Sequence, residues 1–275
     1  MKCQIISMVK DEDDIIEYFI NYYGRLFDYS NIYIIDNLST DKTYKILLKY
    51  KKLHNINVFK KDNYLHKGDY TTNIIKANIH KNYDYIIPVD IDEFLVLFDN
   101  NKIYYDNKII NYLKKFKLND NKIIGIKYLN PIVELEFFSD SLKEIKYSFY
   151  PEDMLIKGII KNNNIMKNIN IDHGNHLWHY EKEKSKLCFI HYHARNKEQH
   201  IKKIINNYKG LGYDDSSVEN IKKTINSSNN TGEHHQNNML KIIQKTYKFP
   251  KHDVDNYDNY IFIGDIVNYI TPKKK

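Results

Sequence analysis

Short apolar runs alternate with longer amphipathic stretches through the first half of the chain. The runs with the length and composition of strands are 3–9, 31–35, 56–59, 85–89, 123–129 and 154–161. Between them, apolar residues recur every three or four positions, as on one face of a helix, at 15–23, 44–52, 70–82 and 109–117. This alternation predicts an α/β fold with a mainly parallel, Rossmann-like sheet flanked by helices.

Polar residues and breakers mark the ends of these elements. Asp13 or Asp14 is expected to cap the helix over 15–23, and Gly24 to end it. Ser39, Thr40 or Asp41 is expected to cap the helix that follows. Pro88 lacks an amide donor, so it predicts an edge position or a bulge for the run at 85–89.

The chain changes character near residue 216. A helical pattern covers 197–210, and beyond it lie an Asn-rich polar patch and short helical patterns. We therefore expect a domain over 1–215 and a small helical C-terminal extension over 216–275. The Tyr-rich helical stretches of this extension could pair two chains as a homodimer.

The bulk composition narrows the class of protein. The 275 residues carry a net charge of +7, but the lysines are scattered, and no RNA-binding or helix-turn-helix signature accompanies them, so no nucleic acid is expected as partner. Two cysteines cannot form a disulfide framework, which favours a reducing compartment. No run approaches the ~20 apolar residues of a membrane span, and no signal peptide precedes the first strand. A soluble, cytoplasmic protein is the expectation.

The most informative segment is the run that ends in Asp90, Ile91, Asp92 and Glu93. In an extended chain, residues two apart point to the same side, so Asp90 and Asp92 would face one pocket while Ile91 faces the core. Open α/β sheets bind ligands at the carboxyl ends of their strands. Carboxylates there suit Mn²⁺ or Mg²⁺, which proteins commonly hold together with substrate phosphates. The predicted ligand is a diphosphate.

Asp36 ends the second strand-like run in the same way. A carboxylate at that position can accept hydrogen bonds from a ribose hydroxyl or a base N–H, although Asp36 and Asn37 could equally form a plain turn. No glycine-rich G-x-G-x-x-G precedes it, which disfavours a nicotinamide cofactor.

Histidines cluster late in the chain. His173, His176 and His179 lie three residues apart, and His191 and His193 lie on one side of a strand-like run. Imidazole is a ready ligand for Mn²⁺ or Zn²⁺, so one of these residues could complete a site begun by Asp92. The planar guanidinium of Arg195 could clamp a diphosphate.

Four segments, taken in order, carry a family resemblance: KDEDDIIEYFINYYGRLF, IYIIDNLSTDKT, IIPVDIDEFL and IHYHAR. Together they resemble the family 2-like and family 92-like glycosyltransferases of the GT-A fold, over residues 1–210. The pairing of IDNLSTDKT with a downstream DIDEFL is the more specific part of the resemblance.

The resemblance implies a UDP-sugar donor and Mn²⁺ or Mg²⁺. Asp36 would contact the nucleoside. Asp92 would bind the metal directly, and Asp90 would contact the ribose or a metal-bound water. His191 matches the late histidine expected near metal and diphosphate, with His193 as the alternative. Diphosphate contacts are expected from the segment of Arg195, Gln199 and Lys203, and a catalytic part from His176, which matches a Gly-x-His element.

The expected reaction is transfer of a hexosyl unit from UDP-sugar to an acceptor hydroxyl, with inversion at the anomeric carbon. The acceptor would be a glycan, a protein or a lipid. The metal would offset charge on the departing UDP, and a carboxylate would act as general base. Asp153 ranks first for that role, ahead of Glu152 and Glu134.

Three other functions compete with this one. A metal-dependent nucleotidyltransferase normally has a glycine-rich and basic loop after its first strand, which KDEDD is not. A zinc hydrolase is disfavoured because neither H-E-x-x-H nor paired cysteines occur. A basic nucleic-acid-binding or scaffold protein with a degenerate transferase fold is the third.

Overall fold

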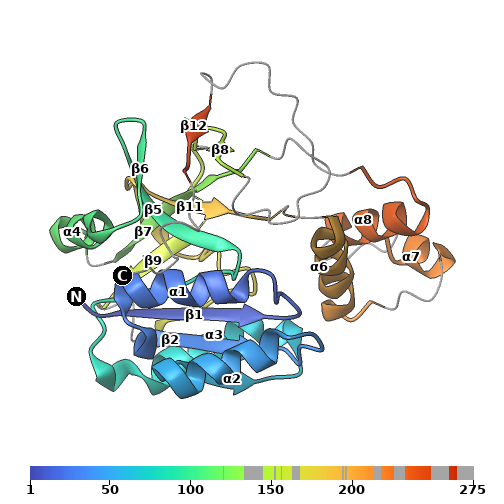
Figure 1. Ribbon diagram of the computed structural model, residues 1–275, viewed down its shortest axis with the longest axis horizontal. Coiled ribbons are helices and arrows are strands. Elements are labelled where there is room, and N and C mark those ends of the chain that lie inside the picture. The colour runs from blue at the N-terminus through green and yellow to red at the C-terminus, as the bar shows by residue number, and fades with distance from the viewer. Residues whose placement is uncertain are drawn as a thin grey trace, which may run out of the picture.

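The computed structural model describes residues 1–119, 121–132, 145–151, 153–155, 157–162, 168–193, 195, 197–213, 218–225, 233–248 and 260–264. Its centre is a mixed sheet of ten strands, flanked by helices (Figure 1). The predicted Rossmann-like α/β architecture is confirmed by this arrangement.

The N-terminal part of the sheet is parallel throughout, in the order β3-β2-β1-β4. Its strands are β1 (Cys3–Val9), β2 (Ile32–Asp36), β3 (Asn57–Lys60) and β4 (Tyr85–Pro88). The connecting helices are α1 (Ile16–Phe27), α2 (Thr43–His54) and α3 (Lys67–Ala77), with short 3₁₀ turns at Tyr29–Asn31, Tyr64–His66 and Ile79–Lys81. Each predicted strand and helix in this part therefore exists close to its expected position.

Antiparallel strands enter the sheet beyond β4, where the order continues β9-β7-β11-β5-β6. These strands are β9 (Lys157–Lys161), β7 (Lys122–Leu129), β11 (Leu187–His191), β5 (Glu93–Asp99) and β6 (Lys102–Tyr104). β9 runs antiparallel to both β4 and β7, and β5 runs antiparallel to β11 and β6. A short β10 (Glu181–Glu183) pairs with β7, and α4 (Asn107–Lys115) follows β6.

Apolar side chains on both faces of the sheet hold the layers together. Along β1, Ile5 belongs to the core under α1, α2 and α4, whereas Ile6 belongs to a second core with Ile75 of α3. Because successive side chains of a strand point to opposite faces, a strand covered on both sides is apolar at most positions, although β1 also buries Gln4 and Ser7. This explains why the strands of the parallel part read as continuous apolar runs.

Helix α1 corrects two of the predicted boundaries. Its N-cap is Ile15, without a side-chain hydrogen bond, so neither Asp13 nor Asp14 caps it. It also passes through Gly24 and ends only at Phe27. A Cβ atom at Gly24 would lie 2.4 Å from the ring of Tyr29, so this glycine makes room for an aromatic ring and does not end the helix.

Helix α2 and strand β4 refine two further predictions. The N-cap of α2 is Lys42, but the carboxylate of Asp41 accepts the amide N–H of Thr43 at 2.8 Å, as a capping residue would. β4 lies inside the sheet and not at its edge. Pro88 is tolerated because the pairing with β9 covers only Tyr85 and Ile86, before the proline is reached.

The C-terminal helices form a group set off from the sheet (Figure 1). These are α6 (Lys197–Gly210), as predicted, α7 (Val218–Ile225) and α8 (Glu233–Ile243), which share a small core of Tyr208, Ile221 and Met239. The chain then returns to the main body, where β12 (Ile261–Phe262) pairs with β8 (Tyr147–Ser148). A domain boundary at 216 remains a prediction.

Two further observations concern the cysteines and the length of the helices. Cys3 and Cys188 are free and buried, and burial raises the pKa of the Cys188 thiol to about 12, which makes it unreactive. In the part of the chain that the structure describes, no helix is long and apolar enough to cross a membrane.

Candidate functional site

A cavity of about 430 Å³ opens at the carboxyl ends of β1 and β4. Its walls come from segments that are distant in the sequence: the end of β1, Tyr64 and, at the start of α3, Lys67, the turn at 90–92, Tyr128 of β7, the loop at 173–176, the end of β11 and one face of α6. It therefore lies where open α/β sheets bind their ligands.

Residues 90–93 form a tight turn between β4 and β5, and this corrects the predicted extended geometry. The amide of Glu93 donates to the carbonyl of Asp90 at 3.1 Å, and the amide of Asp90 donates to the Glu93 carboxylate at 2.9 Å. Asp90 and Asp92 both line the cavity, as expected, but the turn brings them there. Ile91 packs in the core and also touches the cavity.

Asp90 is held by cations on both of its oxygens. Lys67 Nζ lies 2.6 Å from Oδ1, and Lys157 Nζ lies 2.9 Å from Oδ2, while Asn175 Nδ2 donates to Oδ1 at 3.0 Å. Burial opposes charge on Asp90, but Lys157 and Lys67 outweigh it and hold the pKa of this carboxyl well below its usual range. Asp90 is thus a charged carboxylate, and both of its oxygens already accept hydrogen bonds from protein side chains.

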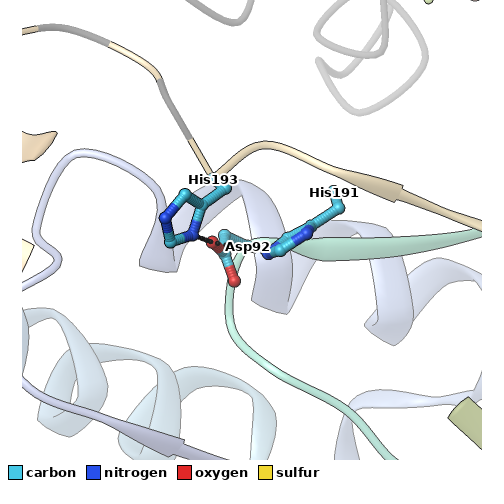
Figure 2. Close-up of side chains that lie close together, drawn as sticks. All are labelled: Asp92, His191 and His193. Atoms are coloured by element: carbon cyan, nitrogen blue, oxygen red, sulfur yellow. Dashed lines mark ion pairs between the residues drawn. The ribbon is translucent and has the colours of Figure 1, made fainter. Parts of the chain in front are cut away.

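Asp92 has a different environment. Its Oδ2 contacts Lys203 Nζ and lies 3.4 Å from His191 Nε2 and 4.0 Å from His193 Nδ1 (Figure 2). Its Oδ1 is buried and has no hydrogen-bond partner. Burial opposes charge here too, but Lys203 and His191 outweigh it and lower the pKa of Asp92 well below the ordinary value.

Asp92, His191 and His193 form a group whose ligand atoms lie within 4.8 Å of one another. A carboxylate with two imidazoles is a donor set that suits Mn²⁺ or Zn²⁺. The buried, unpaired Oδ1 of Asp92 fits this purpose, because an ionised oxygen without a partner is costly unless a cation or donor completes it. These residues therefore fit a divalent metal.

Backbone pairing brings these distant residues together. His191 ends β11 opposite Glu93 of β5, and the amide of Tyr192 donates to the carbonyl of Asp92 at 2.8 Å. The sheet thus aligns two segments about a hundred residues apart. Both His191 and His193 reach Asp92, so the choice between them stays open, although His191 is closer and more buried.

Arg195 lies behind the cavity and does not line it. Its guanidinium binds Asp14 through Nε at 2.8 Å and Glu12 through Nη2 at 3.1 Å. This differs from the predicted diphosphate clamp, because the planar fork is already occupied by carboxylates. Gln199 likewise contacts Asp13, at 3.3 Å, and does not reach the cavity.

Helix α6 supplies one wall of the cavity. Lys203 lines it and contacts Asp92, and Asn206 and Asn207 lie beside Lys203. The helix meets the sheet through polar pairs, such as that of Lys202 with Asp41 at 2.8 Å. Of the residues expected near a diphosphate, Lys203 is the one that lines the cavity, while Arg195 Nη1 lies 3.9 Å from Asp92 Oδ2 without lining it.

His173 and His176 line the cavity together with Lys67 and Tyr64, and the ring of His173 lies against that of Tyr64, with 4.7 Å between the centroids. Burial lowers the pKa of both imidazoles, which keeps them neutral and able to accept a proton near neutral pH. His179, the third histidine of the predicted series, is exposed and does not line the cavity.

The remaining predicted residues lie outside the cavity. Asp36 is fully buried, and its carboxylate accepts the amide of Ser39 at 3.3 Å, in the turn after β2. Asp153 is exposed and pairs with Lys127 at 2.9 Å, away from the other site residues, so its position does not favour a part as general base. Glu134 and Glu152 lie outside the described residues.

Several site residues were not anticipated from the sequence. They are Lys67 and Lys157, which hold Asp90, and Tyr128, whose hydroxyl contacts the buried Glu93. Lys157 gave a signal that could have been used, because a lysine inside the apolar run at 154–161 must be paired if that run is a buried strand.

The chain matches no family model and no curated protein. Solved structures that it resembles include TarS of S. aureus in complex with UDP-GlcNAc, at 13% identity and a TM-score of 0.44, covering 90% of this chain and 72% of that one. Another is the mannosyltransferase PcManGT of Pyrobaculum calidifontis in complex with GDP-Man and Mn²⁺, at 12% identity and a TM-score of 0.43, covering 90% and 76%.

A third is the glucosyl-3-phosphoglycerate synthase of Mycobacterium tuberculosis in complex with phosphoglyceric acid, at 13% identity and a TM-score of 0.31, covering 53% and 47%. All three TM-scores are below 0.5, so the function of this chain has to be argued from its own residues.

Proposed function

We propose that this protein is a metal-dependent glycosyltransferase that moves a hexosyl unit from a UDP-sugar to an acceptor hydroxyl, with inversion at the anomeric carbon. The observation that carries the proposal is the meeting of Asp92, His191 and His193 beside Lys203, with one buried carboxylate oxygen of Asp92 left unpaired. The sequence resemblance to GT-A glycosyltransferases supports the same assignment.

Asp92 and His191, with His193 as the alternative or third ligand, would hold Mn²⁺ or Mg²⁺, and the bound metal would supply Lewis-acid stabilisation of the departing diphosphate. The two imidazoles favour Mn²⁺ over Mg²⁺, which prefers oxygen ligands.

The chain's own cations complete the neutralisation of the diphosphate. Lys203 lines the cavity, donates a hydrogen bond to Asp92 and lies 3.9 Å from Glu12, and its flexible side chain can turn to a phosphate oxygen of a bound ligand. Lys10 lines the cavity near the end of β1 and can approach the same ligand. Arg195 contributes indirectly, because its ion pairs with Glu12 and Asp14 fix the acidic segment at 12–14 against the end of β11.

The acceptor proton needs a base that lines the cavity. Among the described residues, Glu12, His173 and His176 line it and can accept a proton. Of these three, His176 is the residue for which the sequence resemblance already implies a part in catalysis. Its lowered pKa keeps the imidazole unprotonated near neutral pH. Asp90 serves a different purpose: with Lys67 and Lys157 it fixes the turn that presents Asp92.

The test combines binding and turnover. UDP with Mn²⁺ should raise the melting temperature of the protein, because a ligand that binds the folded state stabilises it. A set of UDP-sugars is then screened for Mn²⁺-dependent hydrolysis, first with the parent and then with Asp92→Asn. Asp99→Asn, at the far end of β5 in a surface pair with Lys186, is the matched control and should hydrolyse donor like the parent. Equal hydrolysis by Asp92→Asn would refute the metal assignment.

A further inference from the structure

The loop at residues 172–178 connects the cavity to the protein surface. Asp172 holds it closed: its carboxylate accepts the amide of His176 at 2.8 Å and that of Trp178 at 3.3 Å, and its carbonyl accepts the amide of Asn175 at 3.1 Å. Lys157 binds the carbonyl of Gly174 at 2.6 Å. These bonds fix the loop against the turn at Asp90, so its side chains are presented in a preset geometry.

Aromatic rings run from the cavity to the outside along this loop. His176 lines the cavity and stacks on Trp178, with 5.0 Å between ring centroids and 28° between ring planes. A Cβ atom at Gly174 would lie 2.3 Å from the His176 ring, so the glycine allows the ring to lie flat on the loop. Trp178 is the one tryptophan of the chain and is 58% exposed.

Polar atoms of the same loop are left without partners. His176 Nδ1 and Asn175 Oδ1 are buried and have no hydrogen-bond partner, although Asn175 Nδ2 is bound to Asp90. Buried polar atoms are almost always paired in native proteins, and those that are not mark places where a ligand or water completes the bonding. Lys182 Nζ lies 5.2 Å from the centroid of the Trp178 ring, so the exposed indole offers aromatic surface with a lysine and two unpaired polar atoms beside it.

A pyranose ring has the complementary chemistry, because its C–H face is apolar and its hydroxyl groups point outward. We propose that residues 172–178 form a saccharide-binding subsite at the rim of the cavity, where a sugar ring of the acceptor stacks on Trp178 and its hydroxyl groups bond to the His176 side of the loop. This inference rests on the proposed glycosyl transfer and narrows its acceptor to a saccharide.

The single tryptophan makes a direct binding test available. With excitation at the red edge, where tyrosine does not absorb, the emission reports on Trp178 alone. Methyl glycosides of glucose, galactose, mannose and N-acetylglucosamine, and N,N′-diacetylchitobiose, are titrated with and without UDP and Mn²⁺. At least one should shift or quench the emission saturably, whereas sorbitol, an acyclic hexitol without a ring face, should not. Emission that no saccharide changes, or that sorbitol changes equally, would overturn the proposal.

Variants test the same subsite through turnover. With the saccharide selected by titration as acceptor, Trp178→Ala should raise the acceptor KM by about tenfold, roughly the loss of one stacking contact. Trp178→Phe keeps a flat ring and should stay within about threefold of the parent. Phe262→Ala removes an aromatic ring that is also 58% exposed, on β12, and serves as the matched control. An acceptor KM that is the same in Trp178→Ala and Phe262→Ala would contradict the assignment.

The two proposals fail in different ways. If UDP with Mn²⁺ does not raise the melting temperature, the donor assignment fails, while the saccharide titration of Trp178 still gives its own answer. If the donor binds and is hydrolysed but no saccharide perturbs Trp178, glycosyl transfer stands and the saccharide subsite is wrong.

Discussion

Asp90 and Asp92 are two residues apart on one turn, yet their surroundings differ in kind. Asp90 is saturated: two lysines and an asparagine amide occupy its oxygens. Asp92 contacts a lysine, two histidines and, at 3.9 Å, the guanidinium of Arg195 on one oxygen, and its other oxygen has no hydrogen-bond partner. The difference indicates that two carboxylates close in sequence can have different roles. Asp90 fixes the turn, and Asp92 is the one with bonding capacity left for a ligand.

The largest expected effect comes from removing Lys157, one of the two lysines that bind Asp90. Lys157 is 1% exposed and faces both Asp90 and Glu93, so Lys157→Met removes a cation from the buried Glu93 and leaves Asp90 with Lys67 alone. We expect the free energy of unfolding to fall by about 3–5 kcal/mol, as when one partner of a buried ion pair is removed. Lys49→Met, in an exposed pair with Glu17, should cost about 1 kcal/mol or less. Urea unfolding of both variants gives the comparison, and similar losses would mean that Asp90 is not held by Lys157.

Metal affinity should separate the two aspartates next. In calorimetric titration with Mn²⁺ at saturating UDP, Asp92→Asn should weaken binding by about a hundredfold or more, because it removes the proposed direct ligand. Asp90→Asn would act through the turn alone and should weaken binding by about tenfold. Chelation by EDTA should abolish the UDP-dependent rise in melting temperature of the parent. Equal losses of Mn²⁺ affinity in the two variants would contradict the different roles assigned to Asp90 and Asp92.

A smaller effect should rank the two histidines. His191 Nε2 is nearer to Asp92 than His193 Nδ1, and its side chain is 21% exposed against 47%. His191→Gln should therefore lower Mn²⁺ affinity by about tenfold, and His193→Gln by less. The same titration measures both variants, and the reverse order would make His193 the principal histidine.

The smallest effect concerns Lys202, the neighbour of Lys203 on α6. Burial opposes charge on Asp41, but hydrogen bonds from Lys202 and Thr43 outweigh it and lower its pKa. A lowered pKa contributes stability that is present above the unfolded value of about 3.9 and is lost as the pH falls through the folded value. The parent should exceed Asp41→Asn in unfolding free energy by about 1 kcal/mol or less at pH 7, and by less at pH 3. A difference that grows in acid would contradict this.

The positions of β1, β2, β3, β4, β7 and β9 were predictable because each lies in a largely apolar run, whereas β5, β6, β8, β10 and β12 were not predicted as strands. The order of strands beyond β4 was not predictable, since it depends on β9, β11 and β5 finding partners far away in the sequence. The prediction that Asp90 and Asp92 share a pocket agrees with the structure for a different physical reason: a turn closed by Glu93 replaces the pleat of a strand.

The histidine segment was visible as a motif, but its geometry came from the pairing of β11 with β5. The surroundings of Arg195 could not be anticipated, because Asp14 and Glu12 precede it by about 180 residues. A local pattern indicates which side chains can bind a ligand. Whether they are free to do so depends on long-range partners that only the fold supplies.

Helix α6 is fastened to the sheet in an unusual way: Gln199, Lys202, Lys203 and Asn206 each meet a different aspartate, namely Asp13, Asp41, Asp92 and Asp11. Coulombic attachments weaken as added ions screen them, with a Debye length of about 10 Å at 0.1 M. Apolar packing in the two sheet cores has no such sensitivity. Two of the four contacts are ion pairs, and raised ionic strength should weaken that of Lys202 with Asp41, which is the more exposed, before that of Lys203 with Asp92. The cavity wall formed by α6 should therefore respond to salt more than the apolar cores of the sheet do.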